Sequence, residues 1–237
     1  MRSRDRILVT GSAGRVGRLI TPSLREAFRL RLLDTAPQDA EGDDEIVEAD
    51  VRDVSVVARA CEGVRAVVHL AAQPAEAEFR DILLPRNVDA AWALFEAVVE
   101  AHVPRVVFAS SLQVVEGYGP DELVPAAAEP RPVSVYACTK VFGEALARLH
   151  SDRSGVCVTC LRIGAVRPST SDDLHVDSSL HDIWCGSGDL ARLVIAAIRS
   201  ESGFAIVNAV SPPATRRFDP GNPFGWIPRE TPRMPQD

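Results

Sequence analysis

The sequence is poor in lysine and contains no long apolar run. Its 26 Lys and Arg residues are outnumbered by 33 Asp and Glu, which gives a net charge of −7 with no basic cluster. Because nucleic-acid binders usually carry a basic face, we expect no nucleic-acid partner. No apolar run is long enough to span a bilayer, and the N-terminal residues lack the pattern of a signal peptide. We therefore expect a cytoplasmic protein without a membrane partner.

Cysteines and histidines are few and scattered, with five of each. Cys157 and Cys160 form a C-x-x-C pattern within a segment that resembles a buried strand, where residues three apart point to opposite faces. His175, His181 and Cys185 share an expected loop, but their spacing matches no standard zinc pattern. We therefore predict no metal site.

The composition of the 237 residues, 46% hydrophobic and 25% charged, suits one large α/β domain. Short apolar runs alternate with helical patterns, which is typical of βαβ units and a parallel sheet. Strands are expected over residues 6–10, 29–33, 45–49, 64–70, 105–109, 156–163 and 204–207, and helices up to residue 27 and over 53–61, 79–101, 133–150 and 189–199. The order predicts an α/β fold, a Rossmann-like doubly wound parallel sheet with a small C-terminal substrate appendage.

The chain divides into two functional parts. Residues 1–165 are predicted to form the larger, Rossmann-like part. Residues 166–237 are predicted to form a substrate lid and a short C-terminal appendage, integral to the same domain. Residues 164–187 show little periodicity and are expected to be a loop, of which 168–187 closes over the substrate. Candidate lid residues are Asp172, Asp173, His175 and Trp184.

A glycine motif, T-G-x-x-G-x-x-G, joins the first expected strand to the first helix over residues 10–17. Gly11 permits a tight turn, Gly14 lets the backbone approach a pyrophosphate, and Gly17 lets the helix lie close to the sheet. Asp34 ends the second strand, where its carboxylate can accept both ribose hydroxyls and would repel a 2′-phosphate. This favours NAD, although Arg15 beside the glycines could bind the 2′-phosphate of NADP.

Tyr136 and Lys140 form a Y-x-x-x-K pattern at the start of an expected helix, so they lie on one helical face. A Lys ammonium beside a phenol lowers the pKa of the phenol, which can then move a proton while hydride passes to or from nicotinamide. Ser111 ends the fifth strand, where its hydroxyl can hold the reacting oxygen. His69, which ends the fourth strand, is interpreted as a structural residue.

Together these motifs resemble the extended NAD-dependent epimerase/dehydratase branch of the short-chain dehydrogenases. The resemblance rests on residues 10–17, Asp34, residues 69–72, Asn87-Val88, residues 107–111, Tyr136, Lys140 and Leu161-Arg162. It implies a catalytic set of Ser111, Tyr136 and Lys140, with Asn87 supporting the active-site loop. The residues predicted to bind NAD are Gly11, Ala13, Gly14, Arg15, Val16, Asp34, Asp50, Val51, Leu70, Ala71, Ala72, Asn87, Tyr136, Lys140 and Ile163.

Within this branch the chain is most similar to uronate dehydrogenases, which oxidise C1 of hexuronic acids with NAD. The similarity includes residues 106–111, 142–144, 161–164 and 222–228. Where those enzymes have Asn-His and Ser against the substrate, this chain has Leu112, Gln113 and Ala165, and their substrate-binding Arg falls in the differing loop, with Arg167 as a candidate. The residues predicted to bind substrate are Gln73, Ser111, Leu112, Gln113, Tyr136, Ala165 and Arg167.

The combined interpretation is an NAD-dependent oxidoreductase that oxidises a CH–OH group of a small sugar, a uronate-like sugar acid or a related compound. Leu112 and Gln113 exclude a 4,6-dehydratase, which needs an Asp-Glu pair there. A sugar epimerase that retains NAD and a non-catalytic dinucleotide sensor remain as alternatives. A homodimer or higher oligomer is expected, with Trp92 at the seam and an apolar stripe that serves either the interface or the core: Leu94, Phe95, Val98, Phe142, Leu146 and Leu149.

Overall fold

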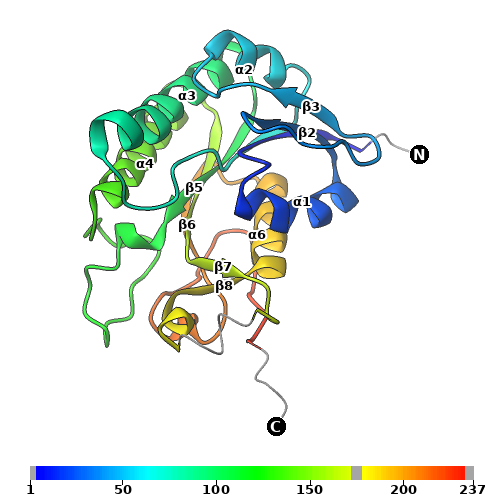
Figure 1. Ribbon diagram of the computed structural model, residues 1–237. Coiled ribbons are helices and arrows are strands. Elements are labelled where there is room, and N and C mark those ends of the chain that lie inside the picture. Colours follow the sequence, from blue (N-terminus) through cyan, green and yellow to red (C-terminus); the bar gives the residue numbers. More distant parts are fainter. Residues whose placement is uncertain (1–3, 172–177, 233–237) are drawn as a thin grey trace.

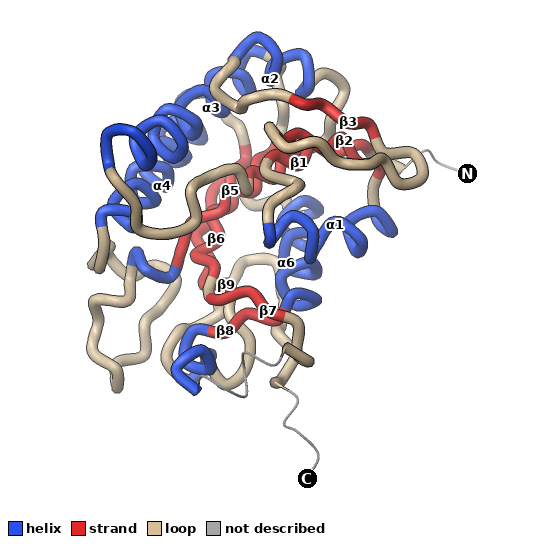
Figure 2. Tube along the Cα trace, in the orientation of Figure 1, coloured by secondary structure: helices blue, strands red, loops and turns tan. Residues whose placement is uncertain are grey.

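The computed structural model describes residues 4–171 and 178–232, and its centre is a seven-stranded parallel sheet (Figures 1 and 2). The strand order is β3-β2-β1-β4-β5-β6-β9, which is the doubly wound arrangement expected from the sequence. The strands are β1 (Arg6–Thr10), β2 (Arg29–Asp34), β3 (Glu45–Glu48), β4 (Ala66–His69), β5 (Arg105–Ser111), β6 (Cys157–Ile163) and β9 (Phe204–Ala209).

Helices cover both faces of the sheet and form two apolar cores. On one face lie α1 (Arg15–Ala27) and α6 (Ser187–Arg199), and on the other lie α2 (Val54–Cys61), α3 (Ala90–Glu100) and α4 (Val135–Ser154). The central strands are buried on both sides, which explains why they are continuous apolar runs rather than alternating ones.

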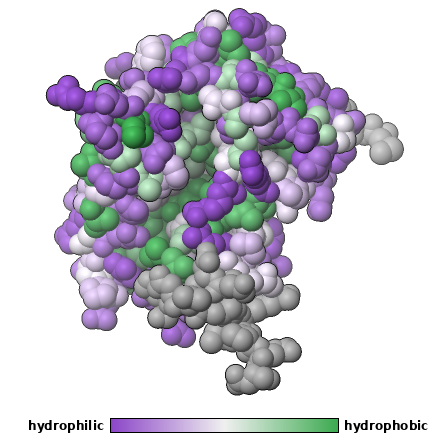
Figure 3. Space-filling view, in the orientation of Figure 1, coloured by the Kyte–Doolittle hydropathy of each residue, from purple (hydrophilic) through white to green (hydrophobic). Residues whose placement is uncertain are grey.

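From the boundary between β1 and β4, the strands β1 to β3 extend towards one edge of the sheet and the later strands extend towards the other edge. The carboxyl ends of β1 and β4 therefore open a crevice at this boundary. At this point the Thr10 hydroxyl lies 2.8 Å from Nδ1 of His69. His69 is fully buried, and burial lowers its pKa to about 3, so the ring is neutral at pH 7. His69 therefore joins β1 to β4, as the structural interpretation expects. Hydrophobic side chains show in the hollow of this face (Figure 3).

The long helix expected over 79–101 is two segments in the structure. Residues Phe79–Asp89 form a π-helix, η1, and α3 begins at Ala90. Pro85 lies inside η1 and has no N–H to donate, which favours a wider helical turn there. The helix type therefore changes at Asp89-Ala90, where the sequence predicts one continuous helix.

The prediction that residues 164–187 form a plain loop is wrong. Residues Ala165–Arg167 (β7) and Trp184–Gly186 (β8) form a parallel two-stranded sheet, and Ser178–Ile183 forms a short 3-10 helix, η3. Trp184 is fully buried and its indole N–H donates to the Arg167 carbonyl, so it is a core residue and not part of a lid. The other lid candidates, Asp172, Asp173 and His175, lie outside the described residues.

The apolar stripe proposed for an interface is divided by the structure. Leu94, Phe95 and Val98 are fully buried in the core beneath α3. Phe142 and Leu149 are each 39% exposed on α4, and Trp92 is 51% exposed on α3. In residues 4–171 and 178–232 no helix is long and apolar enough to cross a membrane, and no cluster of three potential metal ligands is found.

Candidate functional site

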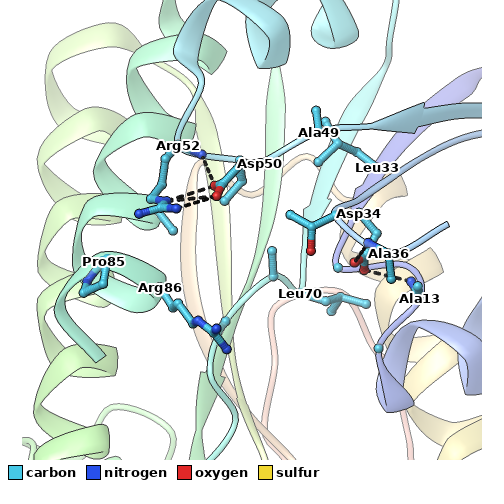
Figure 4. A pocket seen from close by; sticks show the side chains of 17 residues that line it. Ala13, Leu33, Asp34, Ala36, Ala49, Asp50, Arg52, Leu70, Pro85 and Arg86 are labelled. Atoms are coloured by element: carbon cyan, nitrogen blue, oxygen red, sulfur yellow. Dashed lines mark hydrogen bonds and ion pairs between the residues drawn. The ribbon is translucent and has the colours of Figure 1, made fainter. Parts of the chain in front are cut away.

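A cavity of about 490 Å³ follows the carboxyl ends of β1, β2 and β4 (Figure 4). The glycine motif forms one wall. Gly11 has a positive φ of 70°, and a Cβ atom there would lie 2.5 Å from the backbone N of Ala71, so only glycine fits. Gly14 precedes α1 and offers no side-chain cap to the first-turn N–H groups, which leaves them able to bind a phosphate. The residues present therefore fit a dinucleotide.

Asp34 lies at the wall of this cavity, at the end of β2. One carboxylate oxygen accepts a hydrogen bond from the N–H of Ala13 and the other from the N–H of Ala36, each at 3.0 Å. These bonds fix the carboxylate between the glycine loop and the following turn (Figure 4). Each oxygen retains a lone pair, so Asp34 can still accept ribose hydroxyls.

The opposite wall contains two arginines that the sequence analysis did not identify. The Arg52 guanidinium donates three hydrogen bonds to the Asp50 carboxylate, and this pairing holds the pKa of Asp50 below its usual range. Arg86, at the end of η1, points towards the same cavity (Figure 4). Their position depends on how η1 and the turn after β3 fold against the sheet, which no local motif specifies.

Nine of the residues predicted to bind NAD line this first cavity, namely Gly11, Ala13, Gly14, Asp34, Asp50, Val51, Leu70, Ala71 and Ala72. Arg15 does not; it lines a second cavity of about 230 Å³ together with Val16 and Ile163. Arg15, the residue beside the glycines that could bind a 2′-phosphate, therefore lines a different cavity from Asp34. Leu70 and Ala72 line both cavities, which connects them.

The second cavity contains the three predicted catalytic side chains, Ser111, Tyr136 and Lys140. Nζ of Lys140 lies 5.8 Å from the centre of the Tyr136 ring and donates to the Ala109 carbonyl at 3.0 Å. Burial lowers the pKa of Lys140 to about 8. Burial also raises the pKa of Tyr136, and a hydrogen bond with Ser111 partly opposes that rise. The lowered phenol pKa expected from the sequence is thus not found in the protein alone.

The loop after β5 positions the start of α4. Ser134 caps α4 by accepting a hydrogen bond from the N–H of Ala137, and its hydroxyl donates to Oε1 of Gln113 at 2.7 Å. The N–H of Gln113 donates to Oγ of Ser111. Gln113 lines the cavity, as predicted, and also ties Ser111 to the catalytic helix.

Three predicted site residues lie outside both cavities. Asn87 is buried and holds the backbone of Gln73 through both its amide oxygen and nitrogen, and it also donates to the Thr139 hydroxyl. Gln73 is thereby fixed but does not line the substrate cavity. Arg167 donates to the Val166 carbonyl and is also absent from the lining. Asn87 thus holds the backbone at Gln73, and Gln73 and Arg167 lie outside the lining of both cavities.

A buried ion pair supports the floor of the site. Arg162 on β6 binds the Glu144 carboxylate through two hydrogen bonds, and Glu144 also accepts from Ser110 at 2.6 Å. Arg162 further donates to the carbonyls of Ala126 and Ala128. Since Glu144 lies one turn after Lys140 on α4, this network fixes the catalytic helix against β5 and β6.

Comparison with known proteins agrees with this site. The model of the NAD dependent epimerase/dehydratase family matches residues 7–171. The chain belongs to this family. It is therefore an NAD-dependent oxidoreductase, and NAD is the cofactor that the first cavity fits.

Two curated relatives and one solved structure show the range of the similarity. A uronate dehydrogenase from Pseudomonas syringae pv. tomato is 33% identical over 219 residues, covering 91% of this chain and 78% of the relative. An L-arabinose 1-dehydrogenase (NAD(P)(+)) from Haloferax volcanii is 35% identical over 216 residues, covering 82% and 83%. A mutant uronate dehydrogenase from Agrobacterium tumefaciens, complexed with NAD, superposes with a TM-score of 0.84 at 30% identity, covering 98% of this chain and 91% of that one.

Proposed function

We propose that this protein oxidises a CH–OH group of a small free sugar or sugar acid, and that it releases NADH. The observation that carries the proposal is the second cavity, which contains Ser111, Tyr136 and Lys140 and opens into the dinucleotide cavity. At about 230 Å³ it is smaller than the usual range for ligand pockets, about 300–1,000 Å³, so a small substrate suits it better than a nucleotide sugar. The uronate and arabinose dehydrogenases among its relatives support the same substrate class.

Each catalytic side chain has a defined task in this proposal. The Ser111 hydroxyl, held by the N–H of Gln113, donates to the substrate oxygen. The Tyr136 phenolate accepts the proton of the substrate hydroxyl, and the Lys140 ammonium stabilises the phenolate by charge. When bound, NAD supplies the hydride acceptor. Because the three side chains are mostly buried, few waters compete for these hydrogen bonds.

The direct test is NADH absorbance with purified protein, excess NAD and a panel of aldoses, uronates and polyols. We expect turnover with at least one sugar or sugar acid. Tyr136→Phe should reduce kcat by about 10²–10⁴-fold, because it removes the general base, while calorimetry shows that NAD still binds. NAD binding without turnover on the whole panel would contradict the proposal. Product formed without net NADH would instead indicate an epimerase.

We also propose that the protein forms a homodimer in the cytoplasm. Exposed apolar side chains lie on the outer faces of α3 and α4, including Trp92, Phe142 and Leu149, and such patches favour association. All five cysteines are free thiols, which suits a reducing compartment. Analytical ultracentrifugation should give the mass of a dimer at micromolar concentration, and Trp92→Glu should shift it towards the monomer. A wild-type monomer would exclude the homodimer.

A further inference from the structure

The catalytic cavity is not uniformly charged. Its lining includes two cations, Arg15 from the first turn of α1 and Lys140, whose ammonium donates to the Ala109 carbonyl. The remaining wall has one charged side chain among the lining residues that the structure describes, which is Glu116. That wall is formed by Pro74, Leu112, Gln113, Glu116, Gly164, Ala165, Val166 and Ile183.

Glu116 has a fixed position, because the loop that carries it is anchored. Val114 and Val115 before it are fully buried. The carbonyl of Glu116 accepts a hydrogen bond from Nη2 of Arg217 at 3.2 Å, and the same nitrogen donates to the carbonyl of Tyr118. The Glu116 side chain is half-buried, and burial raises its pKa while Arg217 opposes the rise. A carboxyl group is thus held at the substrate wall.

The neighbouring residues offer little to a negatively charged substrate. Leu112 and Ala165 have no polar side-chain atoms, and Gln113, whose Oε1 accepts from Ser134, offers a substrate carboxylate only the N–H groups of a neutral amide and no positive charge. A substrate carboxylate next to Glu116 would meet a like charge in a partly dry cavity, where Coulomb repulsion is stronger than in water. A sugar hydroxyl, in contrast, can donate a hydrogen bond to the Glu116 carboxylate.

We infer that Glu116 is a specificity-determining residue that selects a neutral polyhydroxylated sugar and disfavours a uronate. This inference rests on the proposed function. It defines the substrate class further, because the family similarity alone leaves sugars and sugar acids equally open. Glu116 contributes by accepting a substrate hydroxyl and takes no part in the hydride or proton transfer at Tyr136.

The test compares kcat/KM for neutral aldoses, such as L-arabinose and D-galactose, with kcat/KM for D-galacturonate. We expect the wild type to prefer a neutral aldose by at least about tenfold, since a lost or gained bond to a charged group changes discrimination by that order. Glu116→Gln should lower the aldose-to-uronate ratio by about tenfold or more. Glu116→Asp should keep the discrimination against uronate, because it keeps the charge.

The matched control is Glu129→Gln, an exposed carboxylate of the same loop that does not line the cavity. It should leave the ratio unchanged, and circular dichroism should show that all variants fold. Wild-type preference for uronate, or a ratio unaffected by Glu116→Gln while turnover continues, would overturn the inference and leave the proposed function intact. Absence of turnover on every sugar, with NAD still bound, would overturn both.

Discussion

Lys140 is the only lysine in the sequence, and the structure buries it completely. Burial of an ammonium group is costly, and it lowers the pKa of Lys140 from 10.5 to about 8. At pH 7 the folded protein therefore holds a charge that would be more stable in water. We predict that Lys140→Met stabilises the cofactor-free protein at pH 7 while it abolishes oxidation.

The size of the stability gain follows from the lowered pKa of Lys140. Each pH unit between 8 and 10.5 corresponds to about 1.4 kcal/mol of unfolding free energy, so holding the charge costs about 3 kcal/mol. The substitution also removes the hydrogen bond to the Ala109 carbonyl, a loss of about 1 kcal/mol. The expected net gain for Lys140→Met at pH 7 is about 2 kcal/mol.

The difference in unfolding free energy between Lys140→Met and wild type should change sign at high pH. Between pH 8 and 10.5 the unfolded chain binds a proton at Lys140 that the folded protein has released, so wild-type stability rises with pH in this window. Near pH 10 the two proteins should be about equally stable, and at pH 10.5 the variant should be less stable than wild type by about half a kcal/mol, because the lost hydrogen bond then outweighs the remaining cost of the charge.

Urea denaturation of both proteins between pH 7 and 10.5 measures the difference, and other titrating groups cancel. Because there is one lysine, ¹³C-labelled lysine gives a single NMR signal whose titration reports the pKa directly. A variant no more stable than wild type at pH 7, or a lysine signal that titrates near 10.5, would refute this reasoning.

Three further predictions concern the cofactor, the floor of the site and pH. Asp34→Asn should raise the KM for NAD at least about tenfold and increase the use of NADP, because the charge that repels a 2′-phosphate is lost. An unchanged preference for NAD would argue against this role. Glu144→Ala should destabilise the protein by about 3–5 kcal/mol, because Arg162 is left buried without its partner, whereas Asp152→Asn at an exposed pair should cost less than about 1 kcal/mol by thermal denaturation. The kcat/KM for oxidation should rise with pH, because burial raises the pKa of Tyr136 and less phenolate is present at low pH. The rise should end near pH 8, where Lys140 loses the charge that stabilises the phenolate; a flat profile would count against Tyr136 as the base.

Local spacing in the sequence was sufficient to predict the sheet and much of the site. The glycine motif, Asp34 and the Tyr136–Lys140 pair each depend on residues within one turn, one strand end or one helical face. Such geometry is fixed by the backbone periods of strands and helices, so the sequence alone determines it. The doubly wound parallel sheet followed in the same way from the alternation of strands and helices.

Features that depend on distant segments meeting were decided only by the tertiary structure. Trp184 is covered because β8 pairs with β7, and Leu94 faces inward because α3 packs on the sheet. Glu116 has no motif, and it reaches the catalytic cavity because Arg217, about a hundred residues later, anchors its loop. The sequence by itself determined the glycine turn, the strand-end position of Asp34 and the shared helical face of Tyr136 and Lys140, because each of these is local. The wall that faces the substrate was decided by packing between segments far apart in the chain.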